Sequence, residues 1–277
     1  MLDVKRLKQV ALEIRKLTIE EIGNFGSGHI GGSMSIVEML TYLYYHEMRI
    51  DPSDSKKEDR DRFVCSKGHA GPAVYATLAK KGFFPFEELK TLNQGGTNLP
   101  SHCDMKKTNG VDFTGGSLGQ GFSAAVGIAL GQKIRKIEAN TFVVIGDGES
   151  QEGQIWEGAA TAAQWKLGNL IAFTDFNRLQ LDGYTSDVVS MENIDTRWLG
   201  FNWHVQRING HDFGQIDRAV QTAKSVLDRP SMIIMDTVKS YGFIPGETTT
   251  ANHSMAFDSK AATKAVEDLY AREGGKI

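Results

Sequence analysis

The chain has 277 residues, of which 40% are hydrophobic and 23% charged, proportions typical of a soluble globular protein. A net charge of −3 gives no general attraction to nucleic acid, and no segment approaches the apolar length of a membrane span. The N-terminus lacks the apolar core of a signal peptide. Because only two cysteines occur, Cys65 and Cys103, we expect a cytoplasmic protein with free thiols.

In the first half of the chain, apolar residues at helical spacing predict helices over 4–22 and 35–46. A short strand is predicted over 62–65, followed by helices over 70–81 and 86–92. From 92 to 121 the chain is rich in Gly, Asn and Thr and is predicted to be irregular. A loop of that length inside a compact domain is usually functional.

The second half alternates between helices and strands. Its predicted elements are a helix from Gln120, a strand over 141–145, a helix over 152–166, a strand over 169–174, a short helix near 191–199, a strand over 203–207, a helix over 215–228, a strand over 232–235, a loop over 239–257 and a helix over 258–273. Strands separated by helices, without hairpin signals, predict an α/β fold with a parallel sheet covered by helices on both faces. No linker divides the chain, so a single domain over 1–277 is expected.

Gly146-Asp147-Gly148 follows the apolar run 141–145, and Asn177 follows the next apolar run. Both side chains should therefore lie at the carboxyl edge of the sheet, where open α/β sheets bind ligands. One carboxylate, one amide oxygen and a nearby backbone carbonyl suit a hard cation whose other ligands are phosphate oxygens. The alternative is a simple Asp-Gly turn with Asn177 capping a loop, but the preceding strand favours a metal–diphosphate site.

A glycine-rich segment over 115–121 opens the helix that begins at Gln120. Glycines allow the backbone to approach a ligand closely, and a helix N-terminus offers free N–H groups to an anion. Such loops are common, so this segment supports an anion site only in combination with the metal–diphosphate motif.

Four of the seven histidines lie beside Gly or Ser in irregular segments: His29, His69, His102 and His253. Histidines in loops are more often functional than those on regular elements, and their pKa near neutrality suits proton transfer. The remaining three are given a structural role.

Three acids follow the Gly-Asp-Gly motif: Glu149, Glu152 and Glu157. Acids at a helix N-terminus are favoured by the helix dipole, which explains part of this pattern. Glu152 and Glu157, one helical turn apart, could also relay protons or contact a partner.

Together these motifs resemble transketolase, specifically its N-terminal, thiamine diphosphate-binding part, along nearly the whole chain. By this resemblance Asp147, Asn177 and the carbonyl of Leu179 would hold Mg²⁺ (or Ca²⁺ or Mn²⁺). The cofactor-binding positions that it implies are His69, Gly116, Ser117, Leu118, Gly146, Asp147, Gly148, Glu149, Asn177, Lys239 and His253. The catalytic positions that it implies are His29, His102 and His253, which would handle the sugar oxygens, and Glu152 and Glu157, which match acids at a subunit interface.

The sequence departs from the family in two short stretches and in length. Ile30 stands where a proline is common, and Asp175-Phe176 replaces the usual doubled polar residues before Asn177. Whole transketolases are more than twice this long and continue into pyrimidine-binding and C-terminal domains. The resemblance therefore implies the N-terminal subunit of a split transketolase, paired with a C-terminal subunit in an α2β2 assembly.

The resemblance also implies a reaction: transfer of a two-carbon ketol unit from a ketose or ketose phosphate donor to an aldose. The glutamate that activates the cofactor would lie on the partner, so this chain alone should be inactive. Alternatives are a subunit of another thiamine enzyme, such as deoxyxylulose phosphate synthase or a 2-oxo acid dehydrogenase, a subunit dedicated to branched or sulfonated sugars, and a regulatory cofactor-binding subunit.

Overall fold

The computed structural model describes residues 2–274, so both ends of the predicted domain, residue 1 and residues 275–277, lie outside the described residues. A five-stranded sheet with the order β2-β3-β4-β8-β7 lies at its centre, and every neighbouring pair is parallel. Its strands are Arg62–Cys65 (β2), Thr141–Gly146 (β3), Leu170–Phe176 (β4), His204–Asn209 (β7) and Ser231–Asp236 (β8). The predicted parallel α/β sheet is confirmed.

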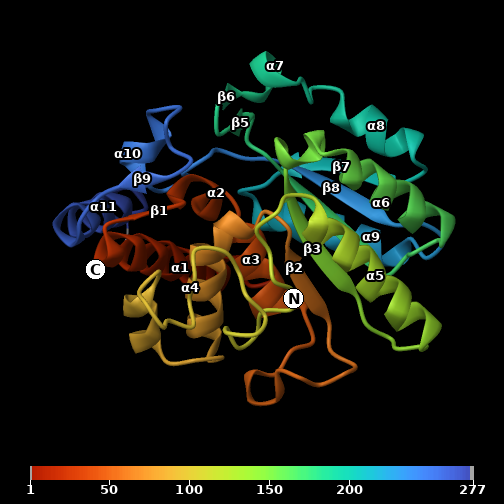
Figure 1. Cartoon of the computed structure of the whole chain (residues 1–277), viewed down its shortest axis with the longest axis horizontal. Helices are drawn as coiled ribbons and strands as arrows, with labels where there is room; N and C mark the ends of the chain where they lie inside the picture. Colours follow the sequence, from red (N-terminus) through yellow and green to blue (C-terminus); the bar gives the residue numbers. More distant parts are fainter. Residues whose placement is uncertain (1, 275–277) are drawn as a thin grey trace.

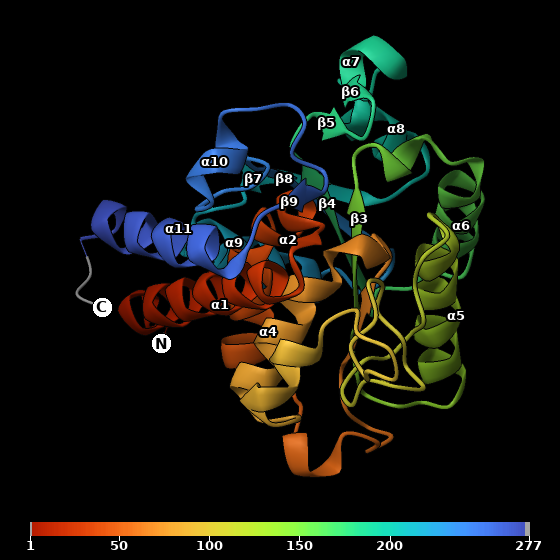
Figure 2. The same cartoon turned by 60° about the vertical axis from the view of Figure 1, so that its left-hand side comes forward.

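Helices cover both faces of this sheet, as Figures 1 and 2 show. The core on one face of the sheet includes residues of Val4–Phe25 (α1), Val37–Tyr42 (α3), Gly71–Lys81 (α4), Phe213–Ser225 (α9) and Ser259–Arg272 (α11). The other face packs against Gln120–Ile134 (α5), Gly153–Gln164 (α6) and Ile194–Gly200 (α8). No described helix is long and apolar enough to cross a membrane.

The central strands show why such a sheet needs uninterrupted apolar runs. Successive side chains of a strand point to opposite faces. Phe142 and Val144 accordingly join the core on one side of β3, while Val143 and Ile145 join the core on the other. All four are fully buried, which is why this run lacks the polar alternation of a half-exposed strand.

Two predicted helices differ in form. The helix predicted over 35–46 is α3 followed by a π-helical turn over Leu43–Glu47, and a short helix that was not predicted, Ile30–Met34 (α2), precedes it. The break between α2 and α3 falls at Ser35, whose hydroxyl donates to Asp175 at 2.6 Å. The segment predicted as a helix over 86–92 is a 3-10 helix, Phe86–Thr91.

Short elements that the sequence did not predict border the carboxyl edge of the sheet. Leu179–Gln180 (β5) and Gly183–Tyr184 (β6) form a hairpin. The short helix Thr185–Val188 (α7) follows it directly, and a second short helix, Ile244–Glu247 (α10), follows β8 in the chain. Ser27–Gly28 (β1) pairs with Met255–Ala256 (β9). No hairpin signal is visible in the sequence here because strands of two residues are too short to show an alternating pattern. The β1–β9 pair joins the segment before His29 to the segment after His253.

Residues 92–119, all of which the structure describes, contain no helix or strand, as predicted. Hydrogen bonds nevertheless hold this segment in place. Tyr75 of α4 donates to the carbonyl of Pro100 at 2.8 Å, and Gly115 N–H donates to the carbonyl of Cys103 at 2.8 Å. His102 therefore lies on a loop that is fixed on both sides.

Candidate active site at the carboxyl edge of the sheet

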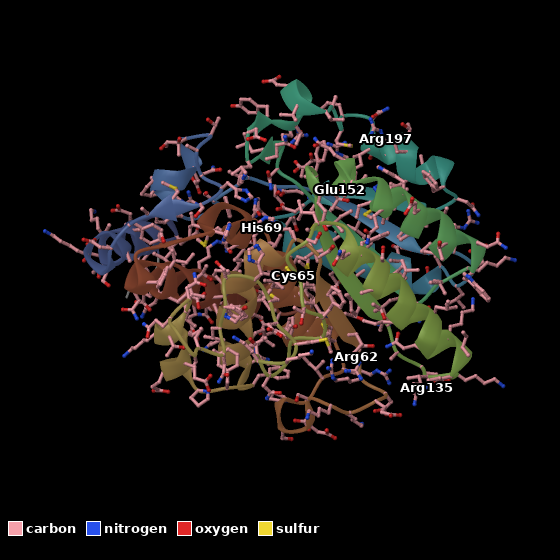
Figure 3. The ribbon with its side chains drawn as sticks, viewed as in Figure 1. Arg62, Cys65, His69, Arg135, Glu152 and Arg197 are labelled. Atoms are coloured by element: carbon pink, nitrogen blue, oxygen red, sulfur yellow. The ribbon has the colours of Figure 1, made fainter. Side chains whose placement is uncertain are left out.

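A cavity of about 350 Å³ lies at the carboxyl ends of β2, β3 and β4. Figure 3 shows His69 just beyond the carboxyl end of β2, which runs from Arg62 to Cys65. The predicted site residues that line the cavity are His29, His69, His102, Gly116, Leu118, Gly146, Asp147, Gly148, Glu149, Glu152, Asn177, Leu179, Lys239 and His253. Residues from distant parts of the chain thus meet at the edge that the sheet topology predicts.

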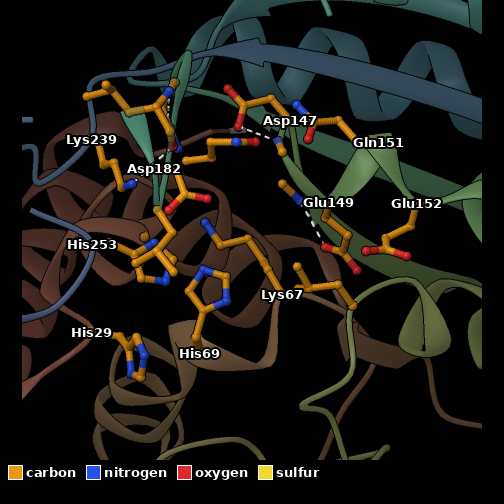
Figure 4. A pocket seen from close by; sticks show the side chains of 18 of the residues that line it. His29, Lys67, His69, Asp147, Glu149, Gln151, Glu152, Asp182, Lys239 and His253 are labelled. Atoms are coloured by element: carbon orange, nitrogen blue, oxygen red, sulfur yellow. Dashed lines mark hydrogen bonds between the residues drawn. The ribbon is translucent and has the colours of Figure 1, made fainter. Parts of the chain in front are cut away.

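The four loop histidines form one cluster, most of which Figure 4 shows at close range. The ring centroid of His29 lies 5.7 Å from that of His69 and 5.4 Å from those of His102 and His253. The His69 and His253 centroids lie 4.7 Å apart. Four separate segments contribute these rings, so the tertiary fold alone brings them together.

Burial lowers the pKa of each of the four histidines. The pKa of His253 falls to about 4, through burial and then the charge of Lys239. That of His69 lies well below its ordinary value through burial and Lys67. At neutral pH the imidazoles are therefore uncharged and can accept a proton or donate a hydrogen bond. The buried Nδ1 of His29 has no hydrogen-bond partner among the described residues.

Two lysines give the cavity its positive charge. Lys67 is almost fully buried, and its Nζ lies 2.5 Å from Asp175 Oδ2. Lys239 donates to the carbonyl of Leu179 at 3.0 Å, and burial followed by the charge of Lys67 lowers its pKa to about 8. A Cβ on Gly32 would lie 3.2 Å from Lys67 Nζ, so glycine keeps this side of the cavity open. Two desolvated ammonium groups facing one cavity suit a multiply charged anion.

The predicted metal ligands lie at the ends of neighbouring strands. Asp147 accepts hydrogen bonds from the N–H groups of Gly148 and Arg178, and Asn177 Oδ1 accepts one from Leu179 N–H at 3.0 Å. Carboxylate, amide and carbonyl oxygens each retain a lone pair for a cation. Burial, followed by the charge of Asp175, raises the pKa of Asp147 to about 7. A divalent cation beside this carboxylate would favour its ionised form.

Asp175 sets the orientation of several of these groups. It is fully buried and accepts hydrogen bonds from Lys67, Ser35, Thr237 and Asn177. Burial alone would raise its pKa, but the charge and hydrogen bond of Lys67 outweigh burial and lower it. Since the Asn177 amide N–H₂ is turned toward Asp175, its Oδ1 must point the other way, which makes Asp175 a positioning residue.

Glu149 lines the cavity, but its oxygens are already engaged by the protein. One oxygen accepts hydrogen bonds from Ser66 Oγ and Gly119 N–H, and the other accepts one from Gly146 N–H at 3.0 Å. This single carboxylate therefore joins the end of β2, the glycine-rich segment and the end of β3. Its predicted cofactor contact stays a prediction, whereas its positioning role is visible.

Two predicted site residues lie outside the cavity. Ser117 and Glu157 do not line it, and both are exposed. Glu152 is also exposed and lies at the cavity edge, on the loop that leads into α6. Any catalytic role of Glu157 would need a second chain against α6, and the predicted roles of all three residues remain untested.

Sequence reasoning missed several residues that line or support the cavity: Gly32, Lys67, Gln151, Asp175, Gln180, Leu181 and Asp182. A signal existed for Asp175, because a carboxylate within a fully buried strand must have a partner. Lys67 is two residues before His69, so it belongs to a loop segment already predicted to be functional from its histidine. Nothing in the sequence pointed to Gln151, Leu181 or Asp182.

Among described groups of His, Cys, Asp and Glu, no set of three or more is arranged to hold a metal ion. A cation at Asp147 would therefore depend on one carboxylate, the Asn177 amide oxygen, the Leu179 carbonyl and oxygens from a ligand. That donor set suits Mg²⁺, which is often bound through one or two carboxylates together with phosphate oxygens.

Comparison with known proteins identifies the family. The profile described as "Transketolase, thiamine diphosphate binding domain" matches residues 7–271. The 6-deoxy-6-sulfo-D-fructose transketolase subunit SqwG of Clostridium sp. (strain MSTE9) is 51% identical over 95% of this chain and 96% of its own length. An apulose-4-phosphate transketolase subunit of Phocaeicola vulgatus is 39% identical over 87% of this chain and 85% of its own length.

Solved transketolases share the fold. The enzyme from Campylobacter jejuni superposes with a TM-score of 0.91 at 27% identity, over 99% of this chain and 44% of its own. That from Leishmania mexicana superposes with a TM-score of 0.89 at 28% identity, over 98% of this chain and 41% of its own. The chain thus spans nearly the full length of the two similar subunits and less than half of these solved enzymes. It belongs to the transketolase family and comprises its thiamine diphosphate-binding domain.

Proposed function

We propose that this chain is the thiamine diphosphate-binding subunit of a two-chain transketolase, which transfers a two-carbon ketol unit from a ketose to an aldose. The observation that carries the proposal is the meeting of three features in one cavity. These are the four uncharged histidines, the two buried lysines, and the oxygens of Asp147, Asn177 and Leu179. A regulatory subunit without a catalytic role would not need this histidine cluster.

The donor set fits magnesium thiamine diphosphate. Lys67 and Lys239 would neutralise the diphosphate, while Asp147, Asn177 and the Leu179 carbonyl would bind Mg²⁺, with Ca²⁺ or Mn²⁺ as substitutes. When bound, the cofactor supplies a thiazolium that stabilises a carbanion next to a carbonyl. Gly116 has a φ of +148° and open space around its Cβ position, so its backbone can approach the cofactor closely.

The histidines would hold and move the protons of the sugar. Cleavage of a ketose removes a proton from a hydroxyl, and addition to an aldehyde returns one to the new hydroxyl. An uncharged imidazole can accept the first and give back the second, since each transfer is the reverse of the other. His29, whose Nδ1 is free of hydrogen bonds to the described residues, and its neighbours His102 and His253 are the residues we assign to these transfers.

A second chain would complete the enzyme. The similar proteins from Clostridium and Phocaeicola are named as subunits, and this chain covers less than half of the solved transketolases. We assign to the partner the glutamate that activates the cofactor and propose an α2β2 assembly in which Glu152 and Glu157 face another chain. Both cysteines are free and buried, as expected in a reducing cytoplasm, where we place the enzyme.

The first donor to test is 6-deoxy-6-sulfo-D-fructose. The protein whose name includes this sugar is 51% identical to the chain, compared with 39% for the protein named for apulose 4-phosphate. Xylulose 5-phosphate and apulose 4-phosphate are the competing donors. Steady-state rates with the three donors and a common aldose would rank them.

The test of the proposed function uses the chain together with its partner subunit, thiamine diphosphate and Mg²⁺. We expect His102→Ala to lower the rate of ketol transfer by about 100-fold or more, the usual effect of losing a general acid–base group. His46→Ala is the matched control, because His46 lies outside the cavity and faces Asp217 at 3.7 Å. An unchanged rate for His102→Ala with every donor would contradict the proposal.

A further inference from the structure

A second cavity, of about 410 Å³, lies at the amino end of β2, between the loop that precedes this strand and residues 105–112 of the irregular segment. Figure 3 shows Arg62, which lines this cavity, at the opposite end of β2 from His69. The charged side chains of the lining are Lys56, Arg60, Arg62, Lys106, Lys107 and Asp112. The cavity shares no lining residue with the candidate active site.

Positive charge is concentrated in this cavity. Five of its lining residues are cationic and one is acidic, a formal excess of four positive charges, although the chain as a whole carries a net charge of −3. Like charges around one cavity repel each other, and an anion bound between them removes that repulsion.

The single acid of the lining, Asp112, is already neutralised by the protein. Its side chain is 5% exposed, and both of its oxygens accept hydrogen bonds from Arg60. Arg62 lies 3.3 Å from one of these oxygens, and the N–H of Phe63 donates to the other at 3.0 Å. Asp104, the other acid of the segment over 92–119, does not line the cavity. The carboxylate of Asp112 is therefore not a counter-charge for the lysines.

The three lysines of the lining have no counter-charge of their own. Lys56, Lys106 and Lys107 are exposed, and none of them forms an ion pair within 4.0 Å with a residue that the structure describes. Lys57, in contrast, pairs with Asp59 at 3.3 Å and lies outside the cavity. Three ammonium groups at one cavity are thus available to an anion.

The two walls of the cavity are joined to each other by hydrogen bonds. Arg60, which is only 7% exposed, donates to the carbonyls of Ser55 at 2.6 Å and Asp61 at 2.9 Å on one wall, and to Asp112 on the other. The hydroxyl of Ser55 also donates to Asn109 Oδ1 at 2.6 Å. A cavity whose backbone is held in this way loses little conformational entropy when a ligand binds.

Charge and size together indicate the class of ligand. A cavity of this volume suits a small molecule, and the negative net charge of the chain disfavours nucleic acid. Lysine and arginine are the side chains that most often bind phosphate groups. A phosphate monoester carries a charge of about −1.5 to −2 at neutral pH, so two such groups match the excess of positive charge.

We propose that this cavity binds a small anion with two phosphate groups, one held by Lys106 and Lys107 and the other by Lys56 and Arg62. The bound anion bridges the loop before β2 and the segment over 105–112, and so stabilises both. The site is separate from the transfer reaction, and its occupancy does not depend on the proposed function.

The test is isothermal titration of the full chain with 1,3-propanediol bisphosphate, with 1,3-propanediol as the uncharged probe. We expect saturable binding of the bisphosphate with a Kd below about 1 mM, and none of the diol. The double variant Lys106→Gln, Lys107→Gln should weaken bisphosphate binding by about tenfold or more, the effect of losing charged hydrogen bonds. Because both side chains are exposed and unpaired in the described structure, the double variant should unfold at the temperature of the wild type or higher without ligand.

Two neighbouring lysines and one active-site lysine locate the site. Lys56→Gln should weaken bisphosphate binding, whereas Lys57→Gln, one residue along and outside the cavity, should not. Lys239→Met, which removes a cation from the candidate active site, should retain this binding. No saturable binding, equal binding of bisphosphate and diol, or wild-type affinity in the double variant would overturn the proposal. Loss of binding in Lys239→Met but not in the double variant would assign the probe to the candidate active site and also overturn it.

Discussion

Replacing Glu38 should destabilise the chain strongly, and by an amount that depends on pH. Glu38 is buried between α1 and the segment that carries Lys239. It lies 2.7 Å from the Arg15 guanidinium and accepts a hydrogen bond from His211 Nδ1 at 3.0 Å. His211 Nε2 in turn accepts one from Val238 N–H at 2.9 Å. Glu38→Gln removes the charge that orders this chain of contacts.

The magnitude follows from the pKa of the carboxyl. Burial alone would raise it, but the charge of Arg15 and the hydrogen bonds of His211 and Arg15 outweigh burial and lower the pKa of Glu38 from 4.5 to about 2. This difference corresponds to about 3 kcal/mol of stability at neutral pH, since each pKa unit is worth about 1.4 kcal/mol. Because the folded-state pKa is depressed, the contribution is present above the unfolded pKa of 4.5 and is lost as pH falls toward 2. At about pH 3 less than half of it should remain.

Urea unfolding of the wild type and of Glu38→Gln, at neutral pH and in steps down to about pH 3, measures this contribution. The stability difference should shrink as pH falls. Glu58→Gln is the control, because Glu58 pairs with Arg135 on the surface, where ion pairs contribute little. A loss for Glu38→Gln no larger than for Glu58→Gln, or one that stays constant with pH, would refute this account of the buried pair.

Three further changes test the candidate site. Lys239→Met should weaken thiamine diphosphate binding by about tenfold or more, measured by titration calorimetry, since it removes a desolvated cation. In the wild type, the affinity for thiamine diphosphate should fall as pH rises through about 8, where Lys239 loses its proton. Asp175→Asn should destabilise the fold by about 3 kcal/mol or more in urea unfolding, because Lys67 is left buried without a counter-charge; an unchanged unfolding free energy would contradict that role. Glu149→Gln should lower the free energy of cofactor binding by more than it lowers the free energy of unfolding, because an amide N–H₂ would face the Gly146 N–H. Wild-type cofactor affinity in Glu149→Gln, or in Lys239→Met, would contradict the role assigned to the residue replaced.

Much of the fold was predictable because the sheet is buried on both faces. A fully buried strand requires an apolar run, and 141–145 and 170–173 are such runs in this sequence. The separate short helix α2 was not predicted, and Ser35 at its end donates a hydrogen bond to Asp175, 140 residues away, a contact that local periodicity cannot reveal. The β5–β6 hairpin was missed because four paired residues leave no periodicity to detect.

The candidate site was predictable where residue type and local context agree. The four histidines share glycine or serine neighbours in loops, and the structure brings them into one cluster. The role of Glu149 was not readable from the sequence, because its three hydrogen-bond donors come from segments up to 83 residues away. A buried strand carboxylate signals a partner, but the identity of that partner could not be predicted, because Lys67 and Asp175 meet only when β2 and β4 enter the same sheet.

The most direct test of the central claim compares ketol transfer by the chain alone with transfer by the chain mixed with its partner subunit. Both samples contain thiamine diphosphate and Mg²⁺, with xylulose 5-phosphate or 6-deoxy-6-sulfo-D-fructose as donor and ribose 5-phosphate as acceptor. The account predicts transfer in the mixture and none above background in either chain by itself. Transfer by this chain alone at the rate of the mixture would contradict a site divided between two subunits.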